Sequence, residues 1–417
     1  MQYMDERWFE RTKEIVFDVS EIYRFNASMQ LSRKERELFL SNEIENPRIS
    51  YNCEALNVVA VDVRVDALKQ EIAASETESL VADFYYEKLD RQVERALLLQ
   101  ATASGDDAAF FASSKVVYGA PKKKYFAYVA ARTLSLIETH QKHHPAAAKR
   151  LKKVLGKIDV SDLAVDVSML PSPVKGGKPL QSLAQAIEIL QAALDRFGVT
   201  GWTIVTREDQ LTHFAVDPNG QVIKVPQEEL FLSRNLTDVA MRGLAEHEVG
   251  VHVRRAFEAT KQPLQLLQIG LDHYLKGEEG VASYVQQQLE GAKEFYGFER
   301  YLAASLAVGM DGEPRDFRAV FSLMTDYYAL KHAELGIDIP PFKPAWDVCV
   351  RIFRGTSGTT PGTIYTKDII YLEGNIGVWN LMSEKPHIFE SLFLGKFNPL
   401  LTRHVKSLEM LGIIKEW

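Results

Sequence analysis

The chain of 417 residues has little cysteine, no excess of positive charge and no long apolar run. Its two cysteines, Cys53 and Cys349, have no C-x-x-C spacing, which excludes a disulfide framework and a cysteine-based zinc knuckle. Lys and Arg total 49 against 56 Asp and Glu, a net charge of -7, so no global basic field is available to hold nucleic acid or an anionic membrane. No run of about 18 apolar residues occurs, and the first residues lack the apolar segment of a signal peptide. We therefore expect a cytoplasmic protein that binds neither nucleic acid nor membrane.

The remaining composition, 46% hydrophobic and 25% charged, is typical of a globular protein with a large core. Apolar residues at helical spacing predict helices before residue 145, the clearest over residues 80–97 and 122–140. Residues 171–179 are rich in Pro and Gly, which predicts a boundary. We expect an N-terminal helical lobe over residues 1–170 and a catalytic domain over residues 171–417, packed as one two-lobed unit.

The second region begins with a predicted helix over residues 180–197. Three short segments with the alternation of strands follow, over residues 202–206, 211–216 and 222–225. The last two are joined by Asp217-Pro-Asn-Gly220, which is a hairpin turn signal. A long helix is predicted from Asn235 or Thr237 to about Phe257. This order predicts a mostly helical α+β fold with a small antiparallel sheet.

The long helix contains His247-Glu248-Val-Gly250-Val-His252, an H-E-x-x-x-H sequence. It is one residue longer than H-E-x-x-H, in which two histidines one helical turn apart bind zinc and the glutamate is the general base. On a regular helix, residues five apart lie about 140° apart around the axis, so both imidazoles cannot reach one ion. A single π turn restores a shared face, and Gly250 is a suitable place for it. The motif therefore predicts His247 and His252 as zinc ligands, and the alternative is two histidines that face different sides.

A catalytic zinc needs three protein ligands and an open position. Glu279, in the segment Gly277-Glu-Glu-Gly-Val-Ala282 at the start of the next predicted helix, is the expected third ligand. Glu278 is the alternative, and both acids also suit the positive end of a helix dipole. His273 is a further candidate, as a ligand or as a residue that supports one.

Residues 247–252 and 278–282 together resemble the motifs of one protein family. This family contains the microtubule-associated tyrosine carboxypeptidases and the bacterial QEGLA-motif proteins, which are described as flavohaemoglobin expression modulators. Other segments are similar to family blocks across most of the chain: Asn46-Pro47 with Tyr51, residues 114–121, residues 349–355, Lys367-Asp368 and residues 371–374. Glu278 stands where the family motif has Gln. Val251 and Val281 stand where Thr and Leu are expected, outside the predicted metal shell.

The resemblance implies a zincin-like metallopeptidase with one zinc ion, which in eukaryotic members removes a C-terminal tyrosine from tubulin. We expect Glu248 to accept a proton from the attacking water and to pass it to the leaving amine. Because this chain is net acidic, it is not suited to holding acidic tubulin tails. We therefore expect a bacterial-type relative that acts on the C-terminus of a peptide or protein, with tyrosine or another aromatic residue as the candidate for removal.

A carboxypeptidase also needs a cation for the terminal carboxylate of its substrate. Arg354 is the first candidate, because a guanidinium pairs with a carboxylate through two hydrogen bonds. Arg255 and Lys367 follow. Each also has a structural interpretation, Arg255 as a partner on its own helix surface and Lys367 as the partner of Asp368.

Tyr371 and Tyr118 are candidate donors to the oxyanion that forms during peptide hydrolysis. Together these residues predict a zinc-dependent carboxypeptidase. A metallo-endopeptidase or aminopeptidase is the first alternative, because a metal and a general base fit any peptide hydrolysis. A regulatory protein that keeps zinc without turnover is the second, although a purely structural site needs no free carboxylate such as Glu248.

Overall fold

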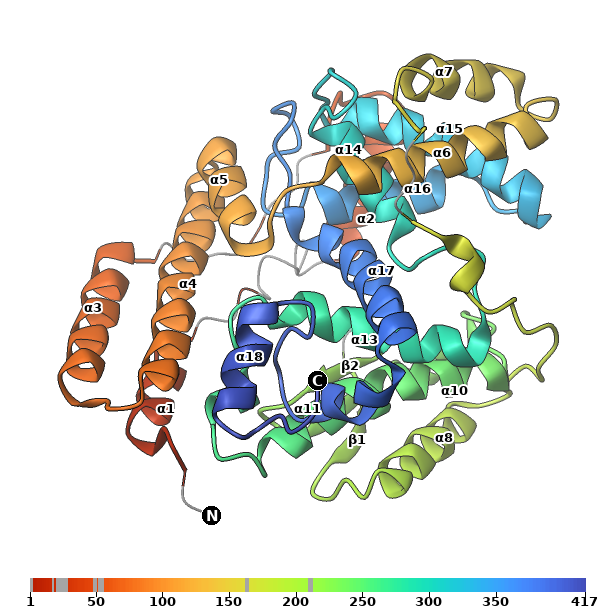
Figure 1. Cartoon of the computed structure of the whole chain (residues 1–417). Helices are drawn as coiled ribbons and strands as arrows, with labels where there is room; N and C mark the ends of the chain where they lie inside the picture. Colours follow the sequence, from red (N-terminus) through yellow and green to blue (C-terminus); the bar gives the residue numbers. More distant parts are fainter. Residues whose placement is uncertain are drawn as a thin grey trace.

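The computed structural model describes residues 3–16, 19, 29–47, 51, 56–161, 165–208 and 213–417, with only the backbone of residues 29–32. Within these ranges the chain is mostly helical with one small sheet, which confirms the expected α+β class (Figure 1). Cys53 lies outside the described residues, and Cys349 is a buried free thiol. Among the described helices, none is long and apolar enough to cross a membrane.

A side-chain cap at the start or a glycine at the end marks four of the helices described in the N-terminal region: α3 (Val58–Ser75), α4 (Ser79–Ser104), α5 (Asp107–Tyr118) and α7 (Pro145–Leu155). The predicted helix over residues 80–97 is longer at both ends, because it begins at a cap formed by Glu78 and ends at Gly105 in the left-handed conformation. The predicted helix over residues 122–140 is confirmed. The other elements are α1 (Glu6–Lys13), α2 (Met29–Leu40), α6 (Lys123–His140) and η2 (Val167–Met169).

The small sheet contains β1 (Thr203–Thr206), β2 (Ala215–Asp217) and β3 (Val222–Val225) in the order β1-β3-β2. β2 and β3 form the predicted hairpin, and an Asp217 carboxylate oxygen accepts a hydrogen bond from the backbone amide of Gly220 at 3.1 Å. β1 pairs with β3 in parallel, so the prediction of an antiparallel sheet is wrong for this pair. Alternating residues predict that strands exist but not which ones become neighbours. β3 is the central strand, with β1 on one side and β2 on the other.

The elements after the linker include the predicted helix over residues 180–197, found as α8 (Leu183–Arg196), which packs with the sheet and the next long helix in one apolar core. The others are α9 (Glu228–Leu232), α10 (Asp238–His247), η3 (Glu248–Val253), α11 (Arg254–Ala259), α12 (Leu266–Ile269), α13 (Tyr274–Glu290), α14 (Phe298–Ala307), α15 (Phe317–Leu335), α16 (Phe342–Ile352), η4 (Thr366–Asp368), α17 (Ile369–Glu384), η5 (Pro386–Phe393) and α18 (Thr402–Met410).

Two hydrophobic cores combine residues from both sides of the predicted boundary at residue 170. One joins Phe110 of α5 to Phe317 and Trp346 of α15 and α16. The other joins Tyr85 of α4 to Phe397 and to residues of α18. The division into two lobes stays a prediction, and the buried contacts described here hold the two regions together.

α13 and α17 cross at short distance because glycines line the crossing (Figure 1). A Cβ atom on Gly280 would lie 2.5 Å from the carbonyl oxygen of Gly374, and a Cβ atom on Gly374 would lie 2.1 Å from the carbonyl oxygen of Lys276. No larger residue fits without moving backbone. The crossing therefore fixes α13, which carries Glu278 and Glu279, firmly against α17.

Candidate metal centre

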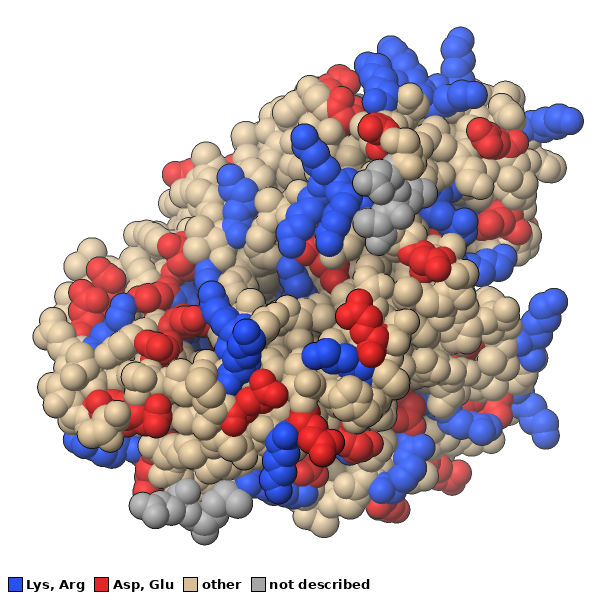
Figure 2. Space-filling view, viewed as in Figure 1, with Lys and Arg blue, Asp and Glu red and all other residues tan. Residues whose placement is uncertain are grey.

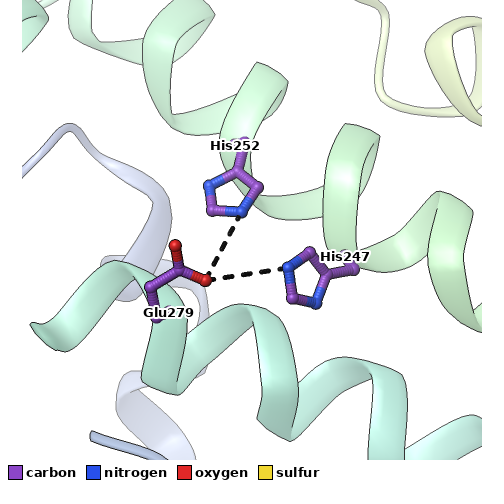
Figure 3. Close-up of side chains that lie close together, drawn as sticks. All are labelled: His247, His252 and Glu279. Carbon is purple, nitrogen blue, oxygen red and sulfur yellow. Dashed lines mark ion pairs between the residues drawn. The ribbon is translucent and has the colours of Figure 1, made fainter. Parts of the chain in front are cut away.

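The predicted long helix is present, and its turn widens where the motif requires it. Thr237 caps α10 by accepting a hydrogen bond from the amide of Ala240 at 3.2 Å, so the helix begins at the predicted position. After His247 the chain forms the π segment η3, which contains Gly250, and α11 continues from it. The two imidazole rings of His247 and His252 lie on one side with centroids 5.1 Å apart (Figure 3). The predicted widened turn is confirmed.

Glu279 of α13 points between the two imidazoles (Figure 3). Its Oε2 atom lies 3.8 Å from Nε2 of His247 and 4.0 Å from Nε2 of His252, and one ligand atom from each residue lies within 4.8 Å of the others. These distances are too long for hydrogen bonds, so the three donors face a common gap. Ligands about 2.1 Å from a tetrahedral ion lie about 3.4 Å apart, so a small contraction would suit one ion. Two imidazoles and one carboxylate are donors that zinc accepts.

Glu278 contacts the imidazole of His252 at Nδ1, the ring nitrogen that does not face Glu279. Its Oε1 atom lies 2.9 Å from Nδ1 of His252, and its Oε2 atom lies 3.5 Å from Nη1 of Arg255. Arg255 is 0% exposed and donates from Nε to the carbonyl oxygen of Gly395 at 2.8 Å and from Nη2 to that of Phe397 at 2.5 Å. Burial and these bonds argue against the predicted contact of Arg255 with substrate. The sequence could not show this, because the two residues whose carbonyl oxygens accept from Arg255 are more than a hundred positions away.

His252, Glu278 and Arg255 contact one another in a row, and their opposite charges shift the pKa values of His252 and Glu278. Burial disfavours charge on His252, but the hydrogen bond and charge of Glu278 outweigh it and raise the pKa of His252 to about 9. Burial likewise opposes ionisation of Glu278, and His252 lowers the pKa of Glu278 to about 2. Burial lowers the pKa of His247. A carboxylate on Nδ1 orients a histidine so that Nε2 faces a metal, and Nε2 of His252 faces Glu279.

Glu248 follows His247 at the first position of η3 and is half-buried. Its charge acts on both imidazoles and on the guanidinium of Arg234. It is not a member of the three-donor group. A carboxylate beside the donors but outside their set is suited to accept a proton from water at the site.

His273, the other ligand candidate, lies elsewhere. Its Nε2 atom is 3.5 Å from Asp272 and 3.2 Å from Nη2 of Arg91, at the start of α13. Within the described part of the chain, the group that could hold a metal contains His247, His252 and Glu279 and does not include His273. The geometry therefore favours Glu279 as the third donor.

A model of the family named microtubule-associated tyrosine carboxypeptidase matches residues 36–416. The chain belongs to this family. The human microtubule-associated tyrosine carboxypeptidase 1 is 26% identical over 235 residues, which cover 48% of this chain and 46% of the human protein. The mouse protein of the same name is 25% identical over 231 residues, which cover 46% and 45%. The aligned part thus spans about half the length of the curated relatives.

In this member of the tyrosine carboxypeptidase family, the other predicted site residues have different surroundings. Lys367 of η4 and Tyr371 of α17 both interact with the charge of Glu279, and burial lowers the pKa of Lys367. Tyr118 is buried, and its hydroxyl accepts a hydrogen bond from the hydroxyl of Tyr365 at 3.0 Å. Nη2 of Arg354 lies 3.6 Å from a carboxylate oxygen of Asp368. Lys367 and Tyr371 are therefore the predicted substrate residues that interact with the charge of the third donor, Glu279.

Asp368 collects several guanidinium groups next to the three donors. Arg351 donates to both of its carboxylate oxygens, at 3.0 and 2.9 Å, and Nη2 of Arg354 lies 3.6 Å away. Arg300 adds a third charge. Burial opposes the charge on Asp368, yet the three cations hold its pKa below the usual range.

Sequence analysis missed Tyr296 and Arg300. The Tyr296 ring lies 6.3 Å from the His247 ring and 5.8 Å from the Tyr371 ring, and the guanidinium of Arg300 lies over both tyrosine rings. No short motif marks them, because they meet Tyr371 only through the packing of α14 against α17. The local signal is Gly297, which has φ +85° and room for no Cβ beside Tyr371.

A cationic pocket adjoins this site. Its lining comes from α4, the end of α5, the start of α13 and α17: Arg91, Arg95, Val117, Tyr118, Asp272, His273, Tyr274, Leu275, Lys276 and Ile370. Two of its lining residues interact with charges of the site: Tyr118 with Lys367, and Tyr274 with Glu278 and Glu279. Figure 2 shows Lys and Arg side chains around a hollow on the face in view. The surroundings of the site therefore carry positive charge although the whole chain is acidic.

Proposed function

We propose that this member of the tyrosine carboxypeptidase family is a zinc-dependent carboxypeptidase that removes the C-terminal residue of a peptide or protein, with tyrosine or another aromatic residue as the candidate. The observation that carries this proposal is the common gap between His247, His252 and Glu279 beside the separate carboxylate of Glu248. Zinc bound by these three residues would act as a Lewis acid and make water a better nucleophile.

The residues of the chain have distinct roles in this proposal. Glu248 accepts the proton of the attacking water and delivers it to the leaving amine. Glu278 keeps Nε2 of His252 directed at the gap. Lys367 and Tyr371, which interact with the charge of Glu279, are the residues that we assign to stabilise the negative charge on the scissile carbonyl oxygen.

Cutting at a C-terminus is supported by the charge around the site. Arg300 and Arg351 both interact with the carboxylate of Asp368, which leaves positive charge for an anionic substrate group. An endopeptidase or aminopeptidase has no use for such positive charge at the cleavage site. The names of the human and mouse relatives agree with this direction of cleavage.

Metal analysis tests the metal site. Purified protein should contain close to one zinc per chain, and His247→Ala and His252→Ala should each lose it. Glu248→Gln should keep the zinc and lose turnover, while the exposed His387→Ala serves as a matched control that keeps both. Full zinc retention by both site histidine variants would refute the metal site. Zinc binding without turnover of any peptide would favour the regulatory alternative.

Peptides with free and amidated C-termini test the direction of cleavage. A free carboxylate gains charge-assisted hydrogen bonds from a cation, and amidation removes them at a cost of roughly 1.5–3 kcal/mol. Mass spectrometry of a mixed peptide library should show loss of one C-terminal residue, about ten- to a hundredfold slower for amides. Equal turnover of acids and amides would point to an endopeptidase or aminopeptidase.

A further inference from the structure

The guanidinium of Arg300 is held by aromatic rings instead of by a carboxylate. Its Cζ atom lies 4.7 Å from the centroid of the Tyr371 ring and 5.5 Å from that of Tyr296. Among the residues that the structure describes, no hydrogen bond or ion pair within 4.0 Å engages this guanidinium, and the side chain is only partly buried. Stacking fixes a guanidinium without using its five donors. Arg300 therefore keeps donors available for a ligand.

Asp368, whose carboxylate interacts with the charge of Arg300, is already engaged by two other guanidinium groups. Both carboxylate oxygens of Asp368 already accept from Arg351, and Arg354 lies 3.6 Å from one of them. Arg354 also donates to the backbone carbonyl of Arg351 at 3.3 Å. Arg300 and Arg351 thus share the charge of one carboxylate, and this excess of positive charge favours the binding of a second anion.

The position of Arg300 suits one end of a substrate. A single ring, that of Tyr296, separates it from His247, with ring centroids 6.3 Å apart. The terminal carboxylate of a peptide lies one residue beyond the scissile bond, a step of about 3.8 Å, and a guanidinium reaches a carboxylate over a further 3 Å or so. A single aromatic ring therefore separates the guanidinium from the metal donors, which leaves a C-terminal residue bound at the donors close to Arg300.

The backbone holds this arrangement rigidly. Gly297 has φ +85°, and a Cβ atom there would lie 2.7 Å from Cβ of Tyr371 and 2.9 Å from the amide nitrogen of Leu372. This close approach packs the start of α14 onto α17 and sets Tyr296 and Arg300 against Tyr371. Arg300 also stands in the first turn of α14, where the helix dipole adds to the positive potential.

We propose that Arg300 binds the terminal carboxylate of the substrate, with Tyr296 and Tyr371 holding its guanidinium in place. The assignment rests on the proposed carboxypeptidase function and moves the predicted carboxylate contact from Arg354 to Arg300. Arg351 and Arg354 then act through Asp368 as the charged support of this subsite.

The test measures binding separately from turnover, in a Glu248→Gln parent that keeps zinc. Calorimetry with N-acetyl-Ala-Ala-Ala-Tyr as free acid and as amide should show about ten- to a hundredfold tighter binding of the acid. Adding Arg300→Gln should remove this preference and leave binding of the amide unchanged. Arg300→Lys, which keeps charge but not the planar fork, should retain part of the preference. Arg242→Gln, an exposed arginine of α10, is the matched control that keeps it.

Two results separate the inference from the proposed function. A parent without preference for the acid would contradict the proposed function itself, and the Arg300 assignment with it. A parent that prefers the acid, with the preference kept in Arg300→Gln and lost in Arg354→Gln or Lys367→Met, would overturn the Arg300 assignment alone. Zinc content and the melting temperature show whether each variant is folded. If Arg300→Gln does not fold, the binding preference of Arg300→Lys decides whether Arg300 contacts the terminal carboxylate.

Discussion

At the residue scale, the three donors His247, His252 and Glu279 depend on side chains that are not themselves members of the group. His252 is held at Nδ1 by Glu278, and Glu278 is held by Arg255, whose other donors end on backbone carbonyl oxygens. Arg255 and Glu278 are buried and His252 is half-buried, and each is paired, so removing one of them leaves another without compensation. The row explains why an ionised carboxylate at position 278 is tolerated in the interior.

Glu278→Ala should weaken zinc binding about ten- to a hundredfold, because His252 loses the carboxylate that orients it. It should also lower the free energy of unfolding of the zinc-free protein by about 3–5 kcal/mol, because the charge of Arg255 stays buried without its partner. Competition with a chelator and urea unfolding measure the two effects. Glu278→Gln keeps an acceptor for Nδ1 and should lose less of both. Unchanged zinc affinity in Glu278→Ala would contradict the orienting role.

Asp368 should make a pH-dependent contribution to stability. Burial raises and the neighbouring arginines lower its pKa, with a net value below the 3.8 of an ordinary Asp. A carboxyl with a lowered folded-state pKa stabilises the fold above pH 3.8 and loses that contribution as the pH falls further. Asp368→Asn should cost about 3–5 kcal/mol at pH 7 and at pH 5, and the difference should narrow below pH 3.8. Urea unfolding of both proteins across this range checks it, and a pH-independent difference would contradict the ion pairing.

The residues that sequence analysis could name are those whose roles follow from local spacing. His247, Glu248 and His252 lie within one short motif, and their geometry follows from helix dimensions. Arg255 and Arg300 could not be placed, because their roles depend on burial and on contacts between distant helices. A sequence shows that an arginine is present but not whether its guanidinium meets carbonyl oxygens, as Arg255 does, or tyrosine rings, as Arg300 does.

At the scale of elements, the π segment η3 converts a spacing that a regular helix cannot use into one shared face. α10 and α11 flank it without a break, so one extra residue is absorbed within a single turn. This element could be predicted because five-residue spacing and a metal site exclude a regular helix. The parallel pairing of β1 with β3 could not, because strand order is decided by packing on α8 and α10 and not by the strands themselves.

A matched deletion and insertion test this role of η3. Deleting Gly250 gives H-E-x-x-H, which places both histidines on one face of a regular helix, so zinc binding should be retained. Inserting one alanine after Gly250 separates the histidines by six residues, about 240° around the axis, and zinc should be lost. Circular dichroism shows whether each variant is folded, and metal analysis gives the zinc content. A folded deletion variant without zinc would contradict the view that the π turn serves only to align the rings.

At the scale of the whole molecule, the regions before and after the linker at residues 171–179 contribute side chains to the same hydrophobic cores. α5 contacts η4 through Ser114, whose hydroxyl accepts from the amide of Thr366 at 2.8 Å, so the N-terminal helices position the segment that carries Lys367. The core around Tyr85 and Phe397 likewise needs both regions. The sequence changes in composition at the predicted boundary near residue 170, but the hydrophobic cores contain residues from both sides of it.

Residues 171–417 alone should therefore not fold as an independent catalytic domain. Without the N-terminal helices, buried side chains such as Leu267, Phe397 and Leu408 become exposed, and each Å² of apolar surface costs about 25 cal/mol. We expect this fragment to aggregate or to bind a hydrophobic dye, and to melt without a single transition, whereas the full chain unfolds cooperatively. Co-expression with residues 1–170 should restore a soluble complex that binds zinc. A monomeric fragment 171–417 that melts cooperatively and holds zinc as tightly as the full chain would show instead that the catalytic domain is independent, and that the N-terminal helices contribute to substrate binding alone.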